Sequence, residues 1–266
     1  MLIDGIPGIM ISIRDRGLLY GDGVFRTLRA TAGSAPHWQH HYRKLRHDCE
    51  AIGISCPDFD LLDLELQSLL NSHPDAVFKI IVTRGPALRG YAPPAASRPA
   101  HIWDVLPAPD YPQHAASLGL CRLRLGIQPR LAGIKHLNRL ENVLAAAECV
   151  DCDEGLLLDM DGRVIEGVRS NLFLFLGGRL VTPELSRCGV AGVQRDLVID
   201  QARRMSLATE VRDVALDEVL AADELFLANS VFGLWQVASF EDRNWTDFGR
   251  TEALRAALHI EADMHA

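Results

Sequence analysis

Lysine is nearly absent from this sequence: of 27 basic residues, 24 are arginine and three are lysine, namely Lys44, Lys79 and Lys135. A chain that uses arginine wherever a cation alone would serve can retain a lysine for its amine. Unlike arginine, lysine can lose its proton and attack a carbonyl carbon. The three lysines are therefore the first candidates for a chemical role.

Long apolar runs are also missing. No run approaches the ~20 residues that a membrane helix needs, and no basic segment followed by an apolar one opens the sequence. We therefore expect a cytoplasmic protein that neither spans a bilayer nor carries a secretion signal. The net charge of -8 and the sequence pI near 5.7 argue against a general binder of nucleic acid or anionic membranes, so the expected partner is a small molecule.

The six cysteines form no recognisable framework. With 266 residues, 48% of them hydrophobic, the chain can bury a substantial core without disulfides, and we expect reduced thiols. Cys149 and Cys152 have C-x-x-C spacing, but no second pair completes a zinc site. We expect neither a redox role nor a metal at this pair, and no metal elsewhere.

The first part of the chain mixes short strand patterns with two amphipathic helices, which the hydrophobic period predicts at residues 40–52 and 58–71. A proline-rich stretch, residues 85–113, follows, and its second half is a candidate linker. The order of elements is not a regular alternation of strand and helix. It predicts an α+β protein with two sub-domains, residues 1–112 and 113–266, of which the second carries Lys135.

In this second part, a strand leads into the loop with Lys135, and a helix follows. The helix is expected to place Leu137, Leu140, Leu144 and Ala147 on one face. Two hairpins are then expected, the first turning at Asp161-Gly162 and the second at Gly177-Gly178. A glycine-led helix follows them, at residues 189–205.

Lys135 stands before a helix whose first turn has unpaired N–H groups. That positive end disfavours a protonated amine, as a lysine that forms a Schiff base requires. Glu166 ends a strand, and a carboxylate there could hold a pyridine nitrogen in its protonated form. Taken singly, each residue fits an ordinary position better: Lys135 as a solvated surface lysine, and Glu166 as an exposed carboxylate at the end of a strand.

Gly189 and Gly192 lie at the start of this glycine-led segment, so the backbone N–H groups of Val193 and Gln194 could begin its helical part and bind an anion. The hydroxyl of Ser230 could add to the same site. A glycine-rich connection without a ligand is the alternative. Taken together, the lysine, the carboxylate and the anion site favour a phosphate-bearing pyridine aldehyde, pyridoxal 5'-phosphate.

The sequence also resembles the fold-type IV, or class IV aminotransferase-like, pyridoxal-phosphate enzymes over nearly its whole length. The matching blocks are "DRGLLYGDGVFRTLR", "TRGPALRGY", "LAGIKHLNRLENVL", "DGRVIEGVRSNLF" and "CGVAGVQRDLV". Within the family, the block "LAGIKHLNRLE" is similar to the aminodeoxychorismate lyases. Branched-chain and D-amino-acid transaminases carry different residues after the lysine.

The resemblance implies a two-domain, D-amino-acid/branched-chain aminotransferase-like fold with the cofactor between the domains. It implies a homodimer in which loops of one subunit complete the site of the other. Lys135 would form the aldimine with pyridoxal phosphate, and Glu166 would contact its pyridine nitrogen. The phosphate would be held by Val193, Gln194 and Ser230. The family usually adds an arginine from an H-x-x-R-L helix, and here Lys44 stands at that position with Arg43 beside it, so either could serve.

The resemblance also implies which residues face the substrate: Tyr20, Thr27, Arg84, Arg89 and Tyr91, with Thr27 assisting Lys135 in catalysis. The implied reaction converts 4-amino-4-deoxychorismate to 4-aminobenzoate and pyruvate, a step toward folate. A transaminase for D- or branched-chain amino acids shares the first half of the chemistry and is the alternative enzyme. A non-catalytic pyridoxal-phosphate carrier is the alternative from another functional class.

Overall fold

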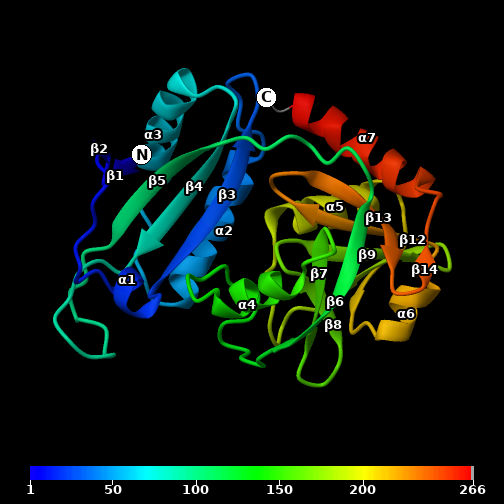
Figure 1. Cartoon of the computed structure of the whole chain (residues 1–266). Coiled ribbons are helices and arrows are strands. Elements are labelled where there is room, and N and C mark those ends of the chain that lie inside the picture. The colour runs from blue at the N-terminus through cyan, green and yellow to red at the C-terminus, as the bar shows by residue number, and fades with distance from the viewer. Residues whose placement is uncertain (265–266) are drawn as a thin grey trace. The chain divides into compact units, whose positions relative to one another are not determined.

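The computed structural model describes residues 1–264, which form two compact units. The first contains Met1–Pro109 together with Ile134–Asn138, and the second contains Asp110–Gly133 together with Arg139–Met264. Each unit has a β-sheet and helices (Figure 1). Each unit also has a hydrophobic core of its own. The expected α+β class is confirmed. The expected domain boundary after residue 112 remains a prediction about how the chain divides.

The first unit is built on a five-stranded antiparallel sheet with the order β2-β1-β5-β4-β3. The strands are β1 (Leu2–Ile3), β2 (Ile6–Pro7), β3 (Gly23–Ala30), β4 (Ala76–Thr83) and β5 (Ala100–Pro107). Its helices are α1 (Arg16–Tyr20), α2 (Trp38–Ala51) and α3 (Phe59–Ser72). The two longer helices confirm the predicted segments with small shifts at their ends.

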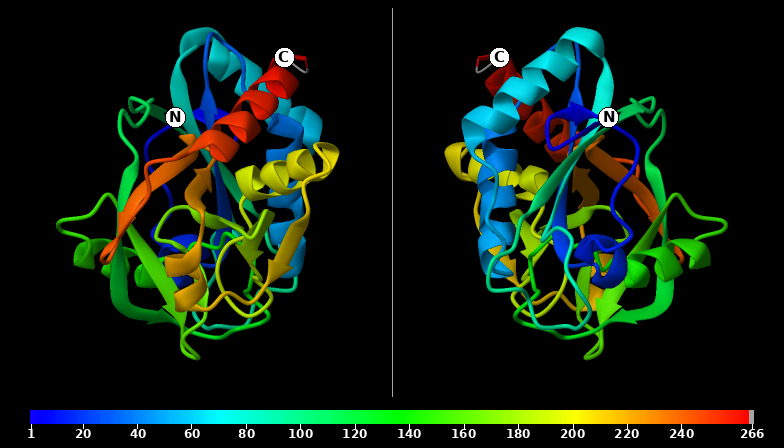
Figure 2. Two further views of the ribbon diagram at one scale, coloured as in Figure 1. Left: turned by 90° about the vertical axis from the view of Figure 1, so that its right-hand side faces the viewer. Right: turned by 90° about the vertical axis from the view of Figure 1, so that its left-hand side faces the viewer.

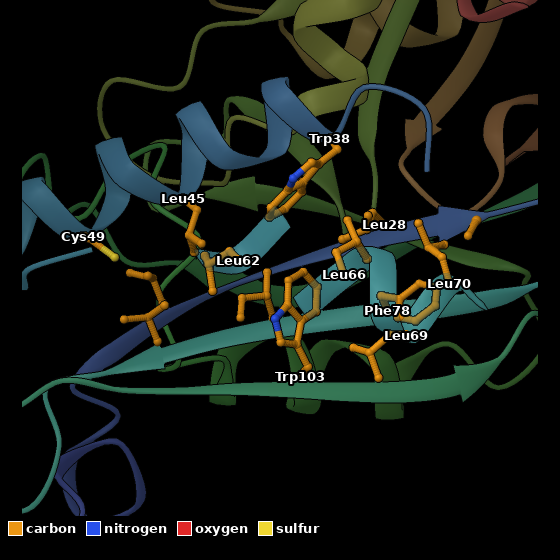
Figure 3. Packing of buried hydrophobic residues seen from close by; sticks show 14 of the residues in the cluster. Leu28, Trp38, Leu45, Cys49, Leu62, Leu66, Leu69, Leu70, Phe78 and Trp103 are labelled. Carbon is orange, nitrogen blue, oxygen red and sulfur yellow. The ribbon is translucent and has the colours of Figure 1, made fainter. Parts of the chain in front are cut away.

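Alternation along β3 determines which face of this sheet is buried. Val24, Leu28 and Ala30 join the core, whereas Phe25 and Thr27 lie on the opposite, half-exposed face. The core side is covered by leucines of α2 and α3, which pack around the rings of Trp38, Phe78 and Trp103 (Figure 3). The other face of β3 carries the half-exposed side chains of Phe25 and Thr27.

The second unit contains a nine-stranded mixed sheet with the order β11-β10-β9-β12-β13-β6-β7-β8, and β14 pairs with β13. Its strands are β6 (Ala116–Leu125), β7 (Glu154–Asp159), β8 (Val164–Gly167), β9 (Asn171–Leu176), β10 (Arg179–Pro183), β11 (Thr209–Arg212), β12 (Glu224–Asn229), β13 (Gly233–Phe240) and β14 (Arg243–Asn244). The helices are α4 (Leu140–Glu148), α5 (Val193–Arg204), α6 (Leu216–Ala221) and α7 (Gly249–Met264). Helices α5 and α7 lie side by side (Figure 2). Both predicted hairpins are confirmed, as β7–β8 and β9–β10.

The segment around Lys135 differs from the prediction. The helix begins only at Leu140, so Leu137 is not part of it. The backbone N–H of Leu137 donates to the carbonyl of Gly23, and the carbonyl of Lys135 accepts from the N–H of Phe25, each at 2.9 Å. Residues 134–138 therefore lie along the free edge of β3 and group with the first unit, although the sequence analysis assigned the lysine to the C-terminal sub-domain.

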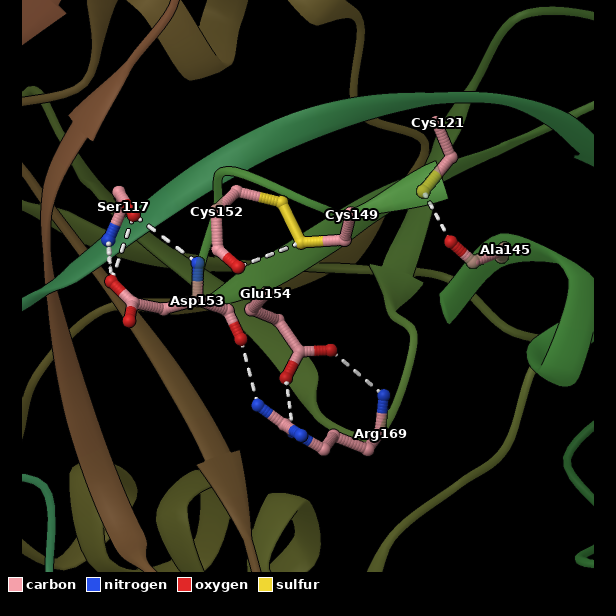
Figure 4. The surroundings of a disulfide bond; sticks show 8 residues. All are labelled: Ser117, Cys121, Ala145, Cys149, Cys152, Asp153, Glu154 and Arg169. Carbon is pink, nitrogen blue, oxygen red and sulfur yellow. Dashed lines mark hydrogen bonds and ion pairs between the residues drawn. A yellow bond between two sulfur atoms is a disulfide. The ribbon is translucent and has the colours of Figure 1, made fainter. Parts of the chain in front are cut away.

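The cysteines also differ from the expectation. A disulfide joins Cys149 and Cys152, where the chain turns after α4 (Figure 4). The turn brings their Cα atoms to 5.3 Å, a separation that a disulfide can span. The expectation of reduced thiols was therefore wrong for this pair, because the C-x-x-C spacing does not show how tightly the chain turns there. Within residues 1–264, no helix is both long and apolar enough to cross a membrane.

Candidate active site

Lys135 is held on three sides within the first unit. Its carbonyl is bound by Phe25, as described above, and its backbone N–H donates to the Oδ2 atom of Asp48 over 3.1 Å. Its Nζ atom lies 4.8 Å from the centre of the Phe25 ring, a cation–π distance. The half-buried amine is therefore directed to the same face of β3 as Thr27.

A buried polar cluster lies on the other side of β3. Arg26 forms an ion pair with Asp48 of α2, and both side chains are almost completely buried. His41, also on α2, is buried beside them. Its burial lowers its pKa to about 3, and the nearby charge of Arg26 adds to the effect. His41 is therefore a neutral side chain at neutral pH.

Two candidate phosphate cations on α2 occupy different environments. Lys44 is half-buried and lies on the same side of the helix as His41 and Asp48, three positions from one and four from the other. Arg43 is exposed. The helical arrangement therefore places Lys44, and not Arg43, on the side of α2 that faces the Lys135 backbone.

The predicted substrate residues fall into two groups. Thr27 lies on the same face of β3 as Phe25, and the rings of Tyr20 and Tyr91 are in contact at a centroid distance of 5.4 Å. Arg89 is exposed, in the loop between β4 and β5. These four side chains have surfaces available to a ligand.

Arg84 is different, because each of the three nitrogens of its guanidinium group donates a hydrogen bond within the protein. Its Nε atom donates to Asp22 over 2.8 Å, and its two Nη atoms donate to the carbonyls of Gly53 and Ile52 over 2.6 and 2.7 Å. The side chain is buried. It connects the end of β4 to the end of α2, and these contacts give it a structural role in the first unit.

Lys79, on β4, also lies close to Phe25. It lies opposite Thr27 in the pairing of β3 with β4, and its Nζ atom is 4.7 Å from the centre of the Phe25 ring. The scarcity of lysine made Lys79 a candidate from the sequence. Only the structure shows that Lys79 and Lys135 lie against the same aromatic ring, that of Phe25. Two amines therefore flank one aromatic side chain.

In the second unit, Glu166 is a buried carboxylate at the end of β8. Its Oε2 atom accepts from the backbone N–H of Val190 over 2.9 Å and from Nδ2 of Asn171 over 3.4 Å. Gly189 packs against it with a φ of +83°, and a Cβ atom there would lie 2.7 Å from Ile165. The carboxylate is held in one orientation by its neighbours.

The predicted anion site at the start of α5 is linked to Glu166 through Asn171. The N-cap residue of α5 is Gly192, and no side chain caps the helix. Asn171 accepts the N–H of Gly192 over 3.1 Å and donates to the carbonyl of Val190 over 2.8 Å. Sequence reasoning missed Asn171, whose only signal is its place in the block that also contains Glu166.

The first N–H groups of α5 have no partner within the helix, so Val193 and Gln194 offer donors for an anion. Ser230 is half-buried in the turn after β12. Asn229 shapes this turn, because its Oδ1 atom accepts the N–H groups of Val231 and Phe232 over 2.9 and 2.8 Å. Among residues 1–264, no cluster of three or more His, Cys, Asp or Glu side chains is arranged to hold a metal ion.

Comparison with curated proteins gives full-length matches. Residues 23–240 match the amino-transferase class IV family. The chain is 34% identical to an aminodeoxychorismate lyase of Vibrio harveyi, over 92% of this chain and 93% of that protein. It is 30% identical to a putative branched-chain-amino-acid aminotransferase of Methanocaldococcus jannaschii, over 88% of this chain and 83% of that protein.

Solved structures give the same range of relatives. The 4-amino-4-deoxychorismate lyase from Pseudomonas aeruginosa is 45% identical, with a TM-score of 0.93 over 98% of this chain and 99% of that one. A branched-chain aminotransferase from Thermoproteus uzoniensis has a TM-score of 0.85 at 19% identity, over 97% of this chain and 92% of that one. The second match shows a shared fold alone.

Proposed function

This chain belongs to the amino-transferase class IV family, and from that premise we propose that it is a pyridoxal-phosphate-dependent lyase that converts 4-amino-4-deoxychorismate to 4-aminobenzoate and pyruvate. The observation that carries the proposal is the 45% identity, over almost the full length of both chains, to the Pseudomonas aeruginosa lyase. The fold-type IV architecture expected from the sequence is confirmed by the same comparison. The substrate is carried over from that relative.

Each unit, taken by itself, carries residues with the chemistry that the proposed cofactor, pyridoxal 5'-phosphate, requires. When bound, this group withdraws electrons from the substrate carbon that bears the amine. Lys135 offers a half-buried amine for its aldehyde, and Glu166 offers a fixed carboxylate for its pyridine nitrogen. The uncapped start of α5 requires glycine at position 192, where a Cβ atom would lie 2.5 Å from Asn171.

The phosphate ligands in this proposal are the N–H groups of Val193 and Gln194, the hydroxyl of Ser230, and Lys44 in preference to Arg43. The partial burial of Lys44 and the greater exposure of Arg43 support that choice. A lysine binds phosphate as a point charge, with less geometric control than a bidentate arginine.

In the proposed reaction, Nζ of Lys135 removes the proton from C4 of the substrate. The bond between the ring and the ether oxygen then breaks, which makes the ring aromatic. Lys135 is proposed to return a proton to the methylene carbon of the departing enol, giving pyruvate. No oxidant, reductant or second substrate is needed. Thr27, on the same face of β3, is proposed to orient the substrate beside this amine.

The substrate has two carboxylates, and cations should recognise them. Arg89 is exposed, and Lys79 shares the Phe25 ring with Lys135, so these two residues are the proposed ligands. Tyr20 and Tyr91 are proposed to line the ring of the substrate with their paired side chains. Arg84 is proposed to be structural.

We also propose a cytoplasmic homodimer. The exposed face of α4 supports the homodimer, because Leu140, Val143 and Leu144 are 68%, 62% and 52% exposed. Adjacent apolar side chains on one helix are typical of a surface that another protein covers. A second copy of the chain is the partner that the family resemblance implies.

The alternative function is that of a transaminase. The 30% identity to the putative branched-chain-amino-acid aminotransferase of Methanocaldococcus jannaschii supports this alternative. The deciding experiment gives the cofactor-loaded protein 4-amino-4-deoxychorismate without a keto acid. Equimolar 4-aminobenzoate and pyruvate over many turnovers is the expected result. If neither product forms, and the protein instead exchanges the amino group of D-alanine or a branched-chain amino acid with a keto acid, the protein is a transaminase and not a lyase.

A further inference from the structure

Arg26 and Asp48 form an ion pair in the core of the first unit, although the proposed reaction uses neither side chain. The side chains are only 2% and 1% exposed. A buried ion pair is weak evidence for added stability, because the cost of removing two charges from water offsets their attraction. The position of this pair therefore needs a different explanation.

Asp48 has a second contact, with the backbone of Lys135. The same Oδ2 atom that accepts from Arg26 also accepts the N–H of Lys135 over 3.1 Å. Hydrogen bonds to a charged acceptor are stronger than those between neutral groups. The carbonyl of Lys135 is meanwhile bound by the N–H of Phe25, the residue next to Arg26 on β3.

These contacts fix both backbone polar groups of Lys135. Its Cα–Cβ bond is therefore directed relative to β3, and the amine reaches the outer face of the strand beside Phe25. Successive residues on a strand point to opposite faces, so Arg26 meets Asp48 on the core side while Phe25 meets the amine on the other. The Arg26–Asp48 ion pair and the amine of Lys135 are thus connected through Phe25 and Arg26, which are adjacent on β3.

We propose that Asp48, held by Arg26, is a positioning residue for Lys135: it fixes the backbone from which the reactive amine extends. The inference rests on the proposed function, in which Lys135 binds the cofactor. Asp48 acts through the backbone and touches neither cofactor nor substrate.

Two double variants separate positioning from stability. Arg26→Met/Asp48→Asn keeps an oxygen that can accept the Lys135 N–H, and Arg26→Met/Asp48→Leu does not. Both remove the two charges together, so neither leaves a buried charge uncompensated. Asn and Leu have similar size, and the variants therefore differ mainly in the acceptor.

The first readout is amide hydrogen exchange at Lys135 in the cofactor-free protein. We expect exchange to be about tenfold faster, or more, in the Leu variant than in the Asn variant. The second readout is the rate at which pyridoxal phosphate becomes attached to Lys135, measured by borohydride reduction and peptide mass spectrometry. We expect at least about a tenfold slower rate in the Leu variant, because small displacements of a reacting group cost large factors in rate.

Equal exchange and equal attachment rates in the two folded variants would overturn the positioning role. If the Leu variant does not fold, Asp48→Glu replaces it, because this change keeps the charge but moves the acceptor by one methylene. The rates of amide exchange and of cofactor attachment at Lys135 are then compared between this variant and the wild-type protein. Equal rates would again overturn the positioning role. Lack of any Lys135 adduct in the wild-type protein would instead contradict the proposed function, and amide exchange would still test the position of the backbone.

Discussion

The Nζ atom of Lys135 lies 4.8 Å from the centre of the Phe25 ring, while the backbone N–H of Phe25 donates to the carbonyl of the same lysine. One residue of β3 thus contacts both ends of Lys135. The side-chain contact can be removed without the backbone contact, because substitution of Phe25 leaves its N–H in place. This separation makes the role of the ring testable.

We expect Phe25→Leu to reduce kcat several-fold, since a cation–π contact at a partly exposed site contributes about 0.5–1 kcal/mol. Phe25→Tyr keeps the ring face and should stay close to wild type. Steady-state assays of 4-aminobenzoate release compare the two. A Leu variant as active as the Tyr variant would show that the ring does not guide the amine.

Lys44 and Arg43 provide a matched test of the phosphate site, because they are neighbours on α2 with different exposure. We expect Lys44→Gln to weaken pyridoxal phosphate binding about tenfold or more, as loss of a hydrogen bond to a charged group does. Arg43→Gln should change the Kd by less than about threefold, because an exposed charge is screened. Titration of the cofactor-free variants with pyridoxal phosphate measures both Kd values. A larger increase in Kd for Arg43→Gln than for Lys44→Gln would identify Arg43 as the phosphate ligand.

Glu166→Gln retains the shape of a side chain that accepts from Val190 and Asn171 but removes its charge. We expect kcat to fall about 100-fold, in line with the loss of one fixed electrostatic group at a reacting centre. Cofactor binding should persist, since the proposed phosphate ligands are unchanged. Parallel measurement of kcat and of bound cofactor tests this. Undiminished turnover in the loaded variant would exclude Glu166 as the partner of the pyridine nitrogen.

His41 should make the protein less stable as the pH falls. Its pKa is about 3 in the folded state against an ordinary value of 6.5, first because it is buried and then because Arg26 is nearby. The unfolded chain therefore binds more protons between these two values, and the stability present above pH 6.5 is lost as pH falls toward 3. The loss from this residue should reach about 2 kcal/mol at pH 5, at 1.36 kcal/mol per pH unit.

The measurement is guanidinium unfolding at pH 7.5 and pH 5 for wild type and His41→Leu. Leucine suits the site because Nδ1 of His41 has no hydrogen-bond partner among residues 1–264. Other charged groups act on the same site, namely Arg26, His37, His40 and Lys135. They remain in the variant, so the difference between the two proteins isolates His41. An equal loss of stability in both proteins would contradict the assignment.

Much of this organisation could be predicted from the sequence because it depends on local periodicity and on short motifs. The period of apolar residues located α2, α3 and the two hairpins, and Asp161-Gly162 and Gly177-Gly178 marked the turns. The block around Lys135 indicated the family. Such signals extend over a few residues, and no long-range contact is needed to read them.

The sequence alone determined the class of fold, the family and the lysine to which the chemistry is assigned. Only the tertiary structure decided that Arg84 is engaged by Asp22 and two carbonyls, that Asn171 links Glu166 to α5, and that Asp48 binds the backbone of Lys135. Each of these contacts joins residues whose side-chain directions depend on how strands and helices pack. Periodicity specifies which face of an element is apolar, whereas the partner of a buried polar atom is fixed only when two elements meet.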